Sequence, residues 1–186
     1  MQPGQIIFEG KIKNGLPIVL RYPEANDLKD LLNYINTLSK ERTYISFQGQ
    51  QLTVDEEKKY LDNVLNKMNK NEDIHILAYS QKALIGIANI TLRERVETHV
   101  GDFGISVAKQ FRNQGIGKLL TEKILEEAGK NLFNLKIVTL VVYANNNIAI
   151  EMYKNFGFKK YGVLPKGIVH RDKFIDQILM YQNLTF

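Results

Sequence analysis

A short glycine-bearing segment, residues 110–118, most constrains how this chain folds and what it binds. The segment follows a strand-like run at 100–107 and opens a helical run from 116 to about 130. The first N–H groups of a helix have no partner inside the helix, and the helix dipole places partial positive charge there. Because glycine lacks a Cβ, a phosphate can approach the backbone of such a turn closely. We therefore predict a pyrophosphate-binding loop formed by Arg112, Asn113, Gln114, Gly115, Ile116, Gly117 and Lys118.

Two other phosphate-binding loops do not fit this segment. A Walker loop ends in Gly-Lys-Ser/Thr, but Gly117-Lys118 is followed by Leu119. A dinucleotide-binding fingerprint needs a third glycine at position 120, which is Leu120. The pattern R-x-x-G-x-G at 112–117, between a strand and a helix, instead resembles the coenzyme A loop of the GNAT superfamily of N-acetyltransferases. Taken alone, the loop is also consistent with an ordinary strand-to-helix turn.

A second run resembles the other characteristic motif of that superfamily. It reads Leu140-x-Val142-x-x-x-Asn146-x-x-Ala149-x-x-x-Tyr153-x-x-x-Gly157-Phe158. Asn146, Ala149 and Tyr153 are spaced so that they share one face of a helix, which offers an amide, a small side chain and a phenol. These three residues are predicted to line the thioester arm of the cofactor. Taken alone, the run also fits a core tyrosine below an N-cap asparagine.

The two motifs occur in the superfamily's order, and the resemblance covers about residues 74–180. It implies an α/β fold: a single N-acetyltransferase domain over residues 1–186, with a mixed central sheet that is splayed at the acetyl-CoA cleft and flanked by helices on both faces. Residue periodicity predicts strands at 6–12, 17–21, 74–79, 83–92, 100–107, 137–143, 158–163 and 174–181. Helices are predicted after residue 23 (with Asn26 or Asp27 as cap), after a capping box at 53–56, at 116–130 and at 147–156. A turn is expected at Asn14-Gly15, and a loop at 165–173.

The resemblance also implies a mechanism. The backbone of Ile105, Ser106 and Val107 is expected to pair with the pantetheine arm as though it were another strand. One of these N–H groups, with Val107 favoured, would hold the developing oxyanion. The amine would attack the thioester directly, without a covalent enzyme intermediate, and Tyr153 would protonate the leaving thiolate as general acid.

The general base is open from sequence. Asp102 is ranked first because related enzymes often carry an acidic residue there, and His99 is second, with Glu97 nearby. In a regular strand Asp102 points to one face, whereas His99 and Glu97 point to the other, so they cannot all serve. Each is also consistent with a structural role, and the base is alternatively a chain of water molecules.

The acceptor site is expected to draw on the segments 39–51 and 165–173. They supply Glu41, Tyr44, Phe47, His170 and Arg171 as candidate substrate-binding residues. The run Lys173-Phe174-Ile175-Asp176-x-x-Leu179-Met180 resembles the branch that contains ribosomal-protein N-terminal and small-amine acetyltransferases. The predicted acceptor is a primary amine on a small molecule or a protein. The alternative function is a catalytically silent module that binds or senses coenzyme A.

Composition excludes several other functions. The chain has no cysteine, which rules out disulfides and cysteine-ligated metal, and its three histidines lack metal-ligand spacing. Ser106, His99 and Asp102 do not form a hydrolase triad, because Ser106 lies in a strand rather than on a nucleophile elbow.

The net charge of +5 is spread along the chain without a nucleic-acid motif. With no apolar run long enough to span a bilayer and no signal-peptide pattern, we expect a cytoplasmic protein that contacts neither membrane nor nucleic acid, with a homodimer among the assemblies compatible with the fold.

Overall fold

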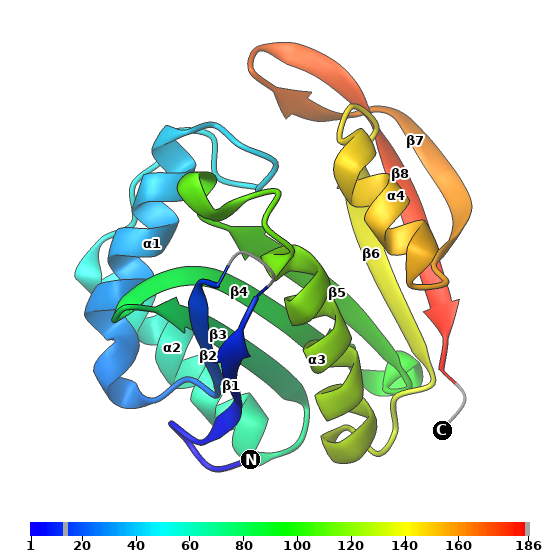
Figure 1. Cartoon of the computed structure of the whole chain (residues 1–186). Coiled ribbons are helices and arrows are strands. Elements are labelled where there is room, and N and C mark those ends of the chain that lie inside the picture. Colours follow the sequence, from blue (N-terminus) through cyan, green and yellow to red (C-terminus); the bar gives the residue numbers. More distant parts are fainter. Residues whose placement is uncertain (13–14, 185–186) are drawn as a thin grey trace.

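The protein is described by a computed structural model, which covers residues 1–12 and 15–184. Its centre is an eight-stranded sheet with the strand order β1-β2-β3-β4-β5-β6-β8-β7 (Figure 1). The strands are β1 Ile6–Lys11, β2 Pro17–Arg21, β3 Asp73–Ser80, β4 Ala83–Leu92, β5 Val100–Val107, β6 Ile137–Tyr143, β7 Lys159–His170 and β8 Lys173–Asn183. The helices are α1 Leu28–Lys40, α2 Val54–Asn69, α3 Ile116–Asn131 and α4 Asn147–Asn155. The predicted α/β class is confirmed.

The sheet is splayed between its two central strands. Among the strands that the structure describes, β5 and β6 are the one parallel pair, and the described register between them is limited to Val100–Ile137, Gly101–Val138 and Asp102–Thr139. β5 continues alongside β4 as far as Val107, while β6 runs alongside β8 over its whole length. The two strands therefore diverge beyond Asp102, as Figure 1 shows for the green β5 and the yellow β6. This confirms the predicted splay.

Helices cover both faces of the sheet, as predicted. On one face, Leu77 of β3 packs against Leu31 of α1 and Leu61 of α2. On the other face, a side chain added at Gly86 of β4 would meet Leu120 of α3. Phe103 of β5 is on this second face and contacts the ring of Tyr153 in α4. Because side chains alternate along a strand, Asp102, Gly104 and Ser106 lie on the α1–α2 face.

Local sequence signals position several of these elements. Thr53 accepts a hydrogen bond from the Glu56 N–H, while the Glu56 carboxylate accepts one from the Thr53 N–H, so the predicted capping box begins α2. Gly157 adopts φ +89, the left-handed conformation that ends α4 and turns the chain toward β7. Along α3, the residues Ile116, Leu120, Ile124 and Ala128 are fully buried.

Three expectations need correction or qualification. The segment predicted as a loop at 165–173 is mostly strand, because Arg171 and Asp172 both adopt positive φ and close a tight hairpin between β7 and β8. Val141 of β6 is 51% exposed, so the α1–α2 face of the sheet is not covered at that residue. Asp27 makes no cap bond to α1, since its carboxylate is buried and binds Arg21 and Tyr79 instead. The predicted Asn14-Gly15 turn includes Asn14, which lies outside the described residues.

No helix in the described part of the chain combines the length and apolar character needed to cross a membrane.

Candidate active site

The glycine loop ends in a helix N-terminus with free backbone donors. Gly115 is the N-cap of α3 and has φ +90, and Asn113 also adopts positive φ. The Leu119 N–H donates to the Gly115 carbonyl as the first bond of the helix. The N–H groups of Ile116, Gly117 and Lys118 therefore have no partner within the helix. A Cβ added at Gly115 would meet no atom within 4 Å, so the space beside this residue is open.

The side chain of Arg112, one of the predicted loop residues, contacts β5 and the residue that follows α1. Its Nε donates to the Val107 carbonyl at 2.8 Å, and its Nη2 donates to Glu41 Oε2 at 2.7 Å. The guanidinium thus joins the end of β5 to the residue that follows α1. Arg112 therefore fixes the strand that leads into the loop.

The free edge of β5 presents alternate backbone groups to the splay. The Ala108 N–H donates to Ile85 of the β4 side, so by antiparallel alternation the Ser106 N–H also faces β4. The N–H groups of Ile105 and Val107 consequently face the splay. Of the three backbone positions predicted to pair with the cofactor arm, Ile105 and Val107 direct their N–H groups into the splay. Ser106 directs its N–H group toward β4 instead. The Ser106 hydroxyl instead lies 3.0 Å from the Tyr34 hydroxyl on the α1–α2 face.

Helix α4 brings Asn146, Ala149 and Tyr153 to the other side of the splay. The Asn146 side chain accepts from the Ala149 N–H at 3.3 Å and is the N-cap, so its amide NH₂ remains the group available to a ligand. Tyr153 is 7% exposed, with its ring 5.9 Å from Phe103 and 5.8 Å from Phe158 between centroids. Burial raises the pKa of the Tyr153 phenol above its ordinary value, which keeps the group protonated. Within the described part of the chain, its hydroxyl has no hydrogen-bond partner.

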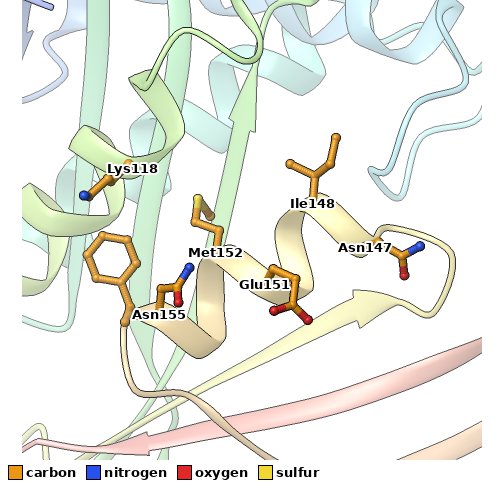
Figure 2. Close-up of a pocket in the computed structure, with 7 residues that line it drawn as sticks. Lys118, Asn147, Ile148, Glu151, Met152 and Asn155 are labelled. Carbon is orange, nitrogen blue, oxygen red and sulfur yellow. The ribbon is translucent and has the colours of Figure 1, made fainter. Parts of the chain in front are cut away.

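A pocket of roughly 670 Å³ lies between the first turn of α3 and the outward face of α4. Figure 2 shows Lys118 of α3 on one side of it and α4, with Ile148 and Met152, on the other. Its lining residues are Lys118, Asn147, Ile148, Glu151, Met152, Asn155 and Phe156. Apart from Lys118, sequence reasoning missed them. The available signal was Ile148, a large apolar residue that α4 leaves 72% exposed.

The candidate bases lie at the closed end of the splay. The Asp102 carboxylate accepts hydrogen bonds from Arg93 and from the Thr139 hydroxyl. Burial alone would raise the pKa of Asp102, but these hydrogen bonds outweigh it and hold that pKa below the ordinary value. Glu97 lies in a short 3₁₀ turn and also binds Arg93, at 2.8 Å, so it does not point away from Asp102 as a regular strand would require. His99 is an exposed turn residue whose carbonyl accepts the N–H groups of Lys136 and Ile137.

Two predicted acceptor-site residues meet over the open end of the splay. The rings of Tyr44 and His170 are 4.8 Å apart, and both contact Tyr143 at the end of β6. The Tyr143 hydroxyl donates to the Ile45 carbonyl at 2.8 Å, and His170 Nε2 lies 2.9 Å from the Arg42 carbonyl. The segment 41–48 is thus attached to β6 and to the β7–β8 hairpin.

The other predicted acceptor-site residues lie around this segment. Glu41 binds Arg112, and Arg171 reaches the Arg42 carbonyl at 3.3 Å. Phe47 is half-buried within the segment. Among the residues that the structure covers, no group of three His, Asp or Glu side chains is arranged to hold a metal ion.

Comparison with known proteins agrees with this arrangement. The model of the acetyltransferase (GNAT) family matches residues 36–158. The L-amino acid N-acetyltransferase AaaT of Escherichia coli is 29% identical over 98 residues, which cover 52% of this chain and 60% of that protein. The match therefore spans less than two thirds of that relative's length.

Solved structures share the fold over nearly the whole chain. A GNAT-family acetyltransferase from Streptococcus pneumoniae is 30% identical with a TM-score of 0.82, covering 90% of this chain and 99% of that one. The structure of yncA from Salmonella typhimurium with its cofactor acetyl-CoA is 14% identical with a TM-score of 0.77, covering 90% of this chain and 94% of that one. With two thirds of its length inside the family match and its splay, glycine loop and α4 tyrosine in the family's order, this chain belongs to the GNAT family of acetyltransferases.

Proposed function

We infer that this protein is an N-acetyltransferase that moves the acetyl group of acetyl-CoA to a primary amine by direct attack within a ternary complex. The observation that carries this proposal is the splay between β5 and β6. It is bordered by free backbone N–H groups of β5, by the N-terminus of α3 and by Tyr153 of α4. The family match supports the reaction class, and the relative named for L-amino acids supports an amine acceptor.

The residues present fit a coenzyme A molecule. The open space at Gly115, where a Cβ would meet nothing within 4 Å, leaves room for a pyrophosphate against the N–H groups of Ile116 and Gly117. Lys118 adds a positive charge at the mouth of the neighbouring pocket, whose roughly 670 Å³ suits the nucleotide part of the cofactor. The Asn146 amide and the small Ala149 side chain line the way from this loop to Tyr153.

Acetyl-CoA supplies its acetyl group as an activated thioester. The N–H groups of Ile105 and Val107 face the splay and are the donors proposed to hold the carbonyl oxygen as negative charge develops on it. Removing a donor of this kind costs about two to three powers of ten in rate. Tyr153 stays protonated because it is buried, and it is the proposed acid for the leaving thiolate.

The acceptor is proposed to enter from the α1–α2 face. Tyr34, Tyr44, Tyr143 and His170 lie on that side of the open end of the splay. Their mixture of rings and hydroxyl groups suits an amine that carries both polar and apolar parts. The general base is proposed to be water held by these groups, because Asp102 is already engaged by Arg93 and Thr139.

The test is titration calorimetry of the purified protein with acetyl-CoA, followed by thiol release with a panel of small amines and N-terminal peptides. We expect binding and turnover that falls sharply in Tyr153→Phe. Binding without turnover by any amine would favour the alternative, a silent coenzyme A sensor. Failure to bind acetyl-CoA would refute both.

A further inference from the structure

The splay has a closed end, and side chains from three neighbouring parts of the sheet meet there. Asp102 of β5 and Thr139 of β6 form the last paired position before the strands diverge. The Thr139 hydroxyl donates to Asp102 Oδ1 at 2.6 Å. Arg93, which directly follows β4, donates through Nε to Oδ2 at 3.0 Å and through Nη2 to Oδ1 at 2.8 Å. These three residues form what we call the clamp.

Arg93 makes further contacts within the clamp and with Glu97. Arg93 Nη2 also reaches Thr139 Oγ1 at 3.2 Å, and Arg93 Nη1 is held by Glu97 at 2.8 Å. Each guanidinium nitrogen is therefore engaged, and a planar guanidinium holds a carboxylate in a fixed geometry. The side chains thus join β4, β5 and β6 at one level of the sheet.

The opposite face of the sheet is tightly packed at the same level. A Cβ added at Gly101 would lie 2.6 Å from Ile90 and 2.9 Å from Leu135. Backbone pairing, this packing and the clamp together set the point at which β5 leaves β6. The Ile105 and Val107 N–H groups lie three and five residues further along β5, so a small rotation at the clamp displaces them relative to Tyr153.

The same contacts make Asp102 unsuitable as a base. Both of its oxygens already accept hydrogen bonds from Arg93, and one accepts from Thr139 as well. Protonating Asp102 would remove the negative charge from a two-point ion pair. The amine's proton therefore leaves by another route.

We propose that Arg93, Asp102 and Thr139 are positioning residues that fix the divergence of β5 from β6, and that Asp102 is not the general base. This proposal rests on the proposed acetyltransferase function. It predicts that substitutions in the clamp weaken the affinity for acetyl-CoA. The same substitutions should leave the pH dependence of turnover unchanged.

The test compares four variants by calorimetric affinity for acetyl-CoA, by the pH profile of kcat and by melting temperature. Thr139→Val should weaken acetyl-CoA binding about threefold to tenfold, the effect of one lost hydrogen bond, and Thr139→Ser should restore it. Asp102→Asn should weaken binding similarly and lower kcat by less than about tenfold with the profile unchanged, whereas loss of a true base costs about 10²- to 10⁴-fold.

Thr91→Val is the matched control. The Thr91 hydroxyl makes the same kind of bond, to Asp73 Oδ1 at 3.1 Å, but between β3 and β4, which stay paired along their length. It should lower the melting temperature about as much as Thr139→Val and leave acetyl-CoA affinity unchanged.

Two outcomes would overturn the proposal. One is a large loss of kcat in Asp102→Asn, together with loss of the acid side of the kcat pH profile and wild-type affinity for acetyl-CoA. That result would make Asp102 the base. The other is equal affinity in Thr139→Val, Thr91→Val and the wild type. A wild-type protein that bound no acetyl-CoA would show that the acetyltransferase function itself had failed, and the clamp with it.

Discussion

Arg112 Nη2 donates to Glu41 Oε2 at 2.7 Å, across 71 residues of sequence. The contact joins the residue after α1 to the loop that leads into α3. Because Arg112 Nε also binds the Val107 carbonyl, the same guanidinium touches the acceptor side and the strand edge proposed to hold the acetyl group. The two sides of the site are therefore mechanically connected.

We expect Glu41 and Arg112 to be energetically coupled. The carboxylate is largely buried and the guanidinium is one-third exposed, so the pair is less screened than a surface ion pair. In a double-mutant cycle, Glu41→Gln and Arg112→Gln should show a coupling of about 1 kcal/mol in the free energy of unfolding. Chemical denaturation of the four proteins measures it. Additive effects would mean that the contact is not maintained in solution.

Gly115→Val should abolish acetyl-CoA binding while the protein remains folded. A Cβ at Gly115 meets no atom within 4 Å, so the fold has room for the new side chain. We expect that side chain to crowd a phosphate bound at the N-terminus of α3. At φ +90 the substitution should also cost about 1–3 kcal/mol of stability through backbone strain.

Gly15→Val controls for that strain. Gly15 has φ +83 and equally open surroundings, but it lies in the connection between β1 and β2. It should lower the melting temperature to a similar degree and keep wild-type affinity. Retained affinity in Gly115→Val would contradict the phosphate-loop assignment.

Tyr153→Phe should reduce turnover by about two powers of ten with little change in acetyl-CoA affinity or melting temperature. Phenylalanine keeps the ring contacts with Phe103 and Phe158, and the hydroxyl has no partner among the described residues. Since burial raises the Tyr153 pKa, the wild-type enzyme should stay active above pH ~10, where an ordinary phenol ionises. Stopped thiol-release assays across pH check both points. An equal loss of affinity and turnover would argue for a binding role alone.

Asp27→Asn should destabilise the fold by about 2 kcal/mol or more at neutral pH. Asp27 is buried and accepts from Arg21 at 2.8 Å, from the Glu24 N–H at 2.8 Å and from Tyr79 at 3.0 Å. Burial alone would raise the Asp27 pKa, but these bonds prevail and lower it.

A carboxyl whose pKa is lowered by folding contributes stability above its unfolded pKa, near ~4, and loses it as pH falls through the folded pKa. Urea denaturation from about pH 2 to about pH 7 measures this effect. The free energy of unfolding of the wild type should fall below pH ~4. In Asp27→Asn that part of the fall should disappear. A pH dependence that Asp27→Asn leaves unaltered would show that other groups cause it.

Elements with local signals were predictable from sequence. β5 and β6 have the predicted bounds. The Thr53–Glu56 capping box begins α2 and Gly157 ends α4 as expected, because caps and strand periodicity depend on residues close in the chain. The glycine loop was identified for the same reason. The two final strands were predicted, but the tight turn between β7 and β8 was missed, because neither Arg171 nor Asp172 is a glycine that would mark it.

Side-chain partners far apart in sequence were not predictable. The Arg112–Glu41 pair and the contact of Arg93 with Thr139 depend on how strands and helices are stacked. Sequence spacing placed Asp102 on the correct strand but could not show that Arg93 and Thr139 engage it.

β5 and β6 are paired at three positions, so the backbone connection between the two halves of the sheet is short. We expect the two halves to unfold less cooperatively than a continuously paired sheet would. β6, α4, β7 and β8 are contiguous in sequence, and their backbone pairs with the rest of the sheet through this junction. We expect them to open with a lower free energy than global unfolding, which amide hydrogen exchange would measure. A ligand that spans the junction would bind only when both halves are closed. Binding of such a ligand should therefore slow amide hydrogen exchange in both halves of the sheet. The two halves would then open together rather than separately.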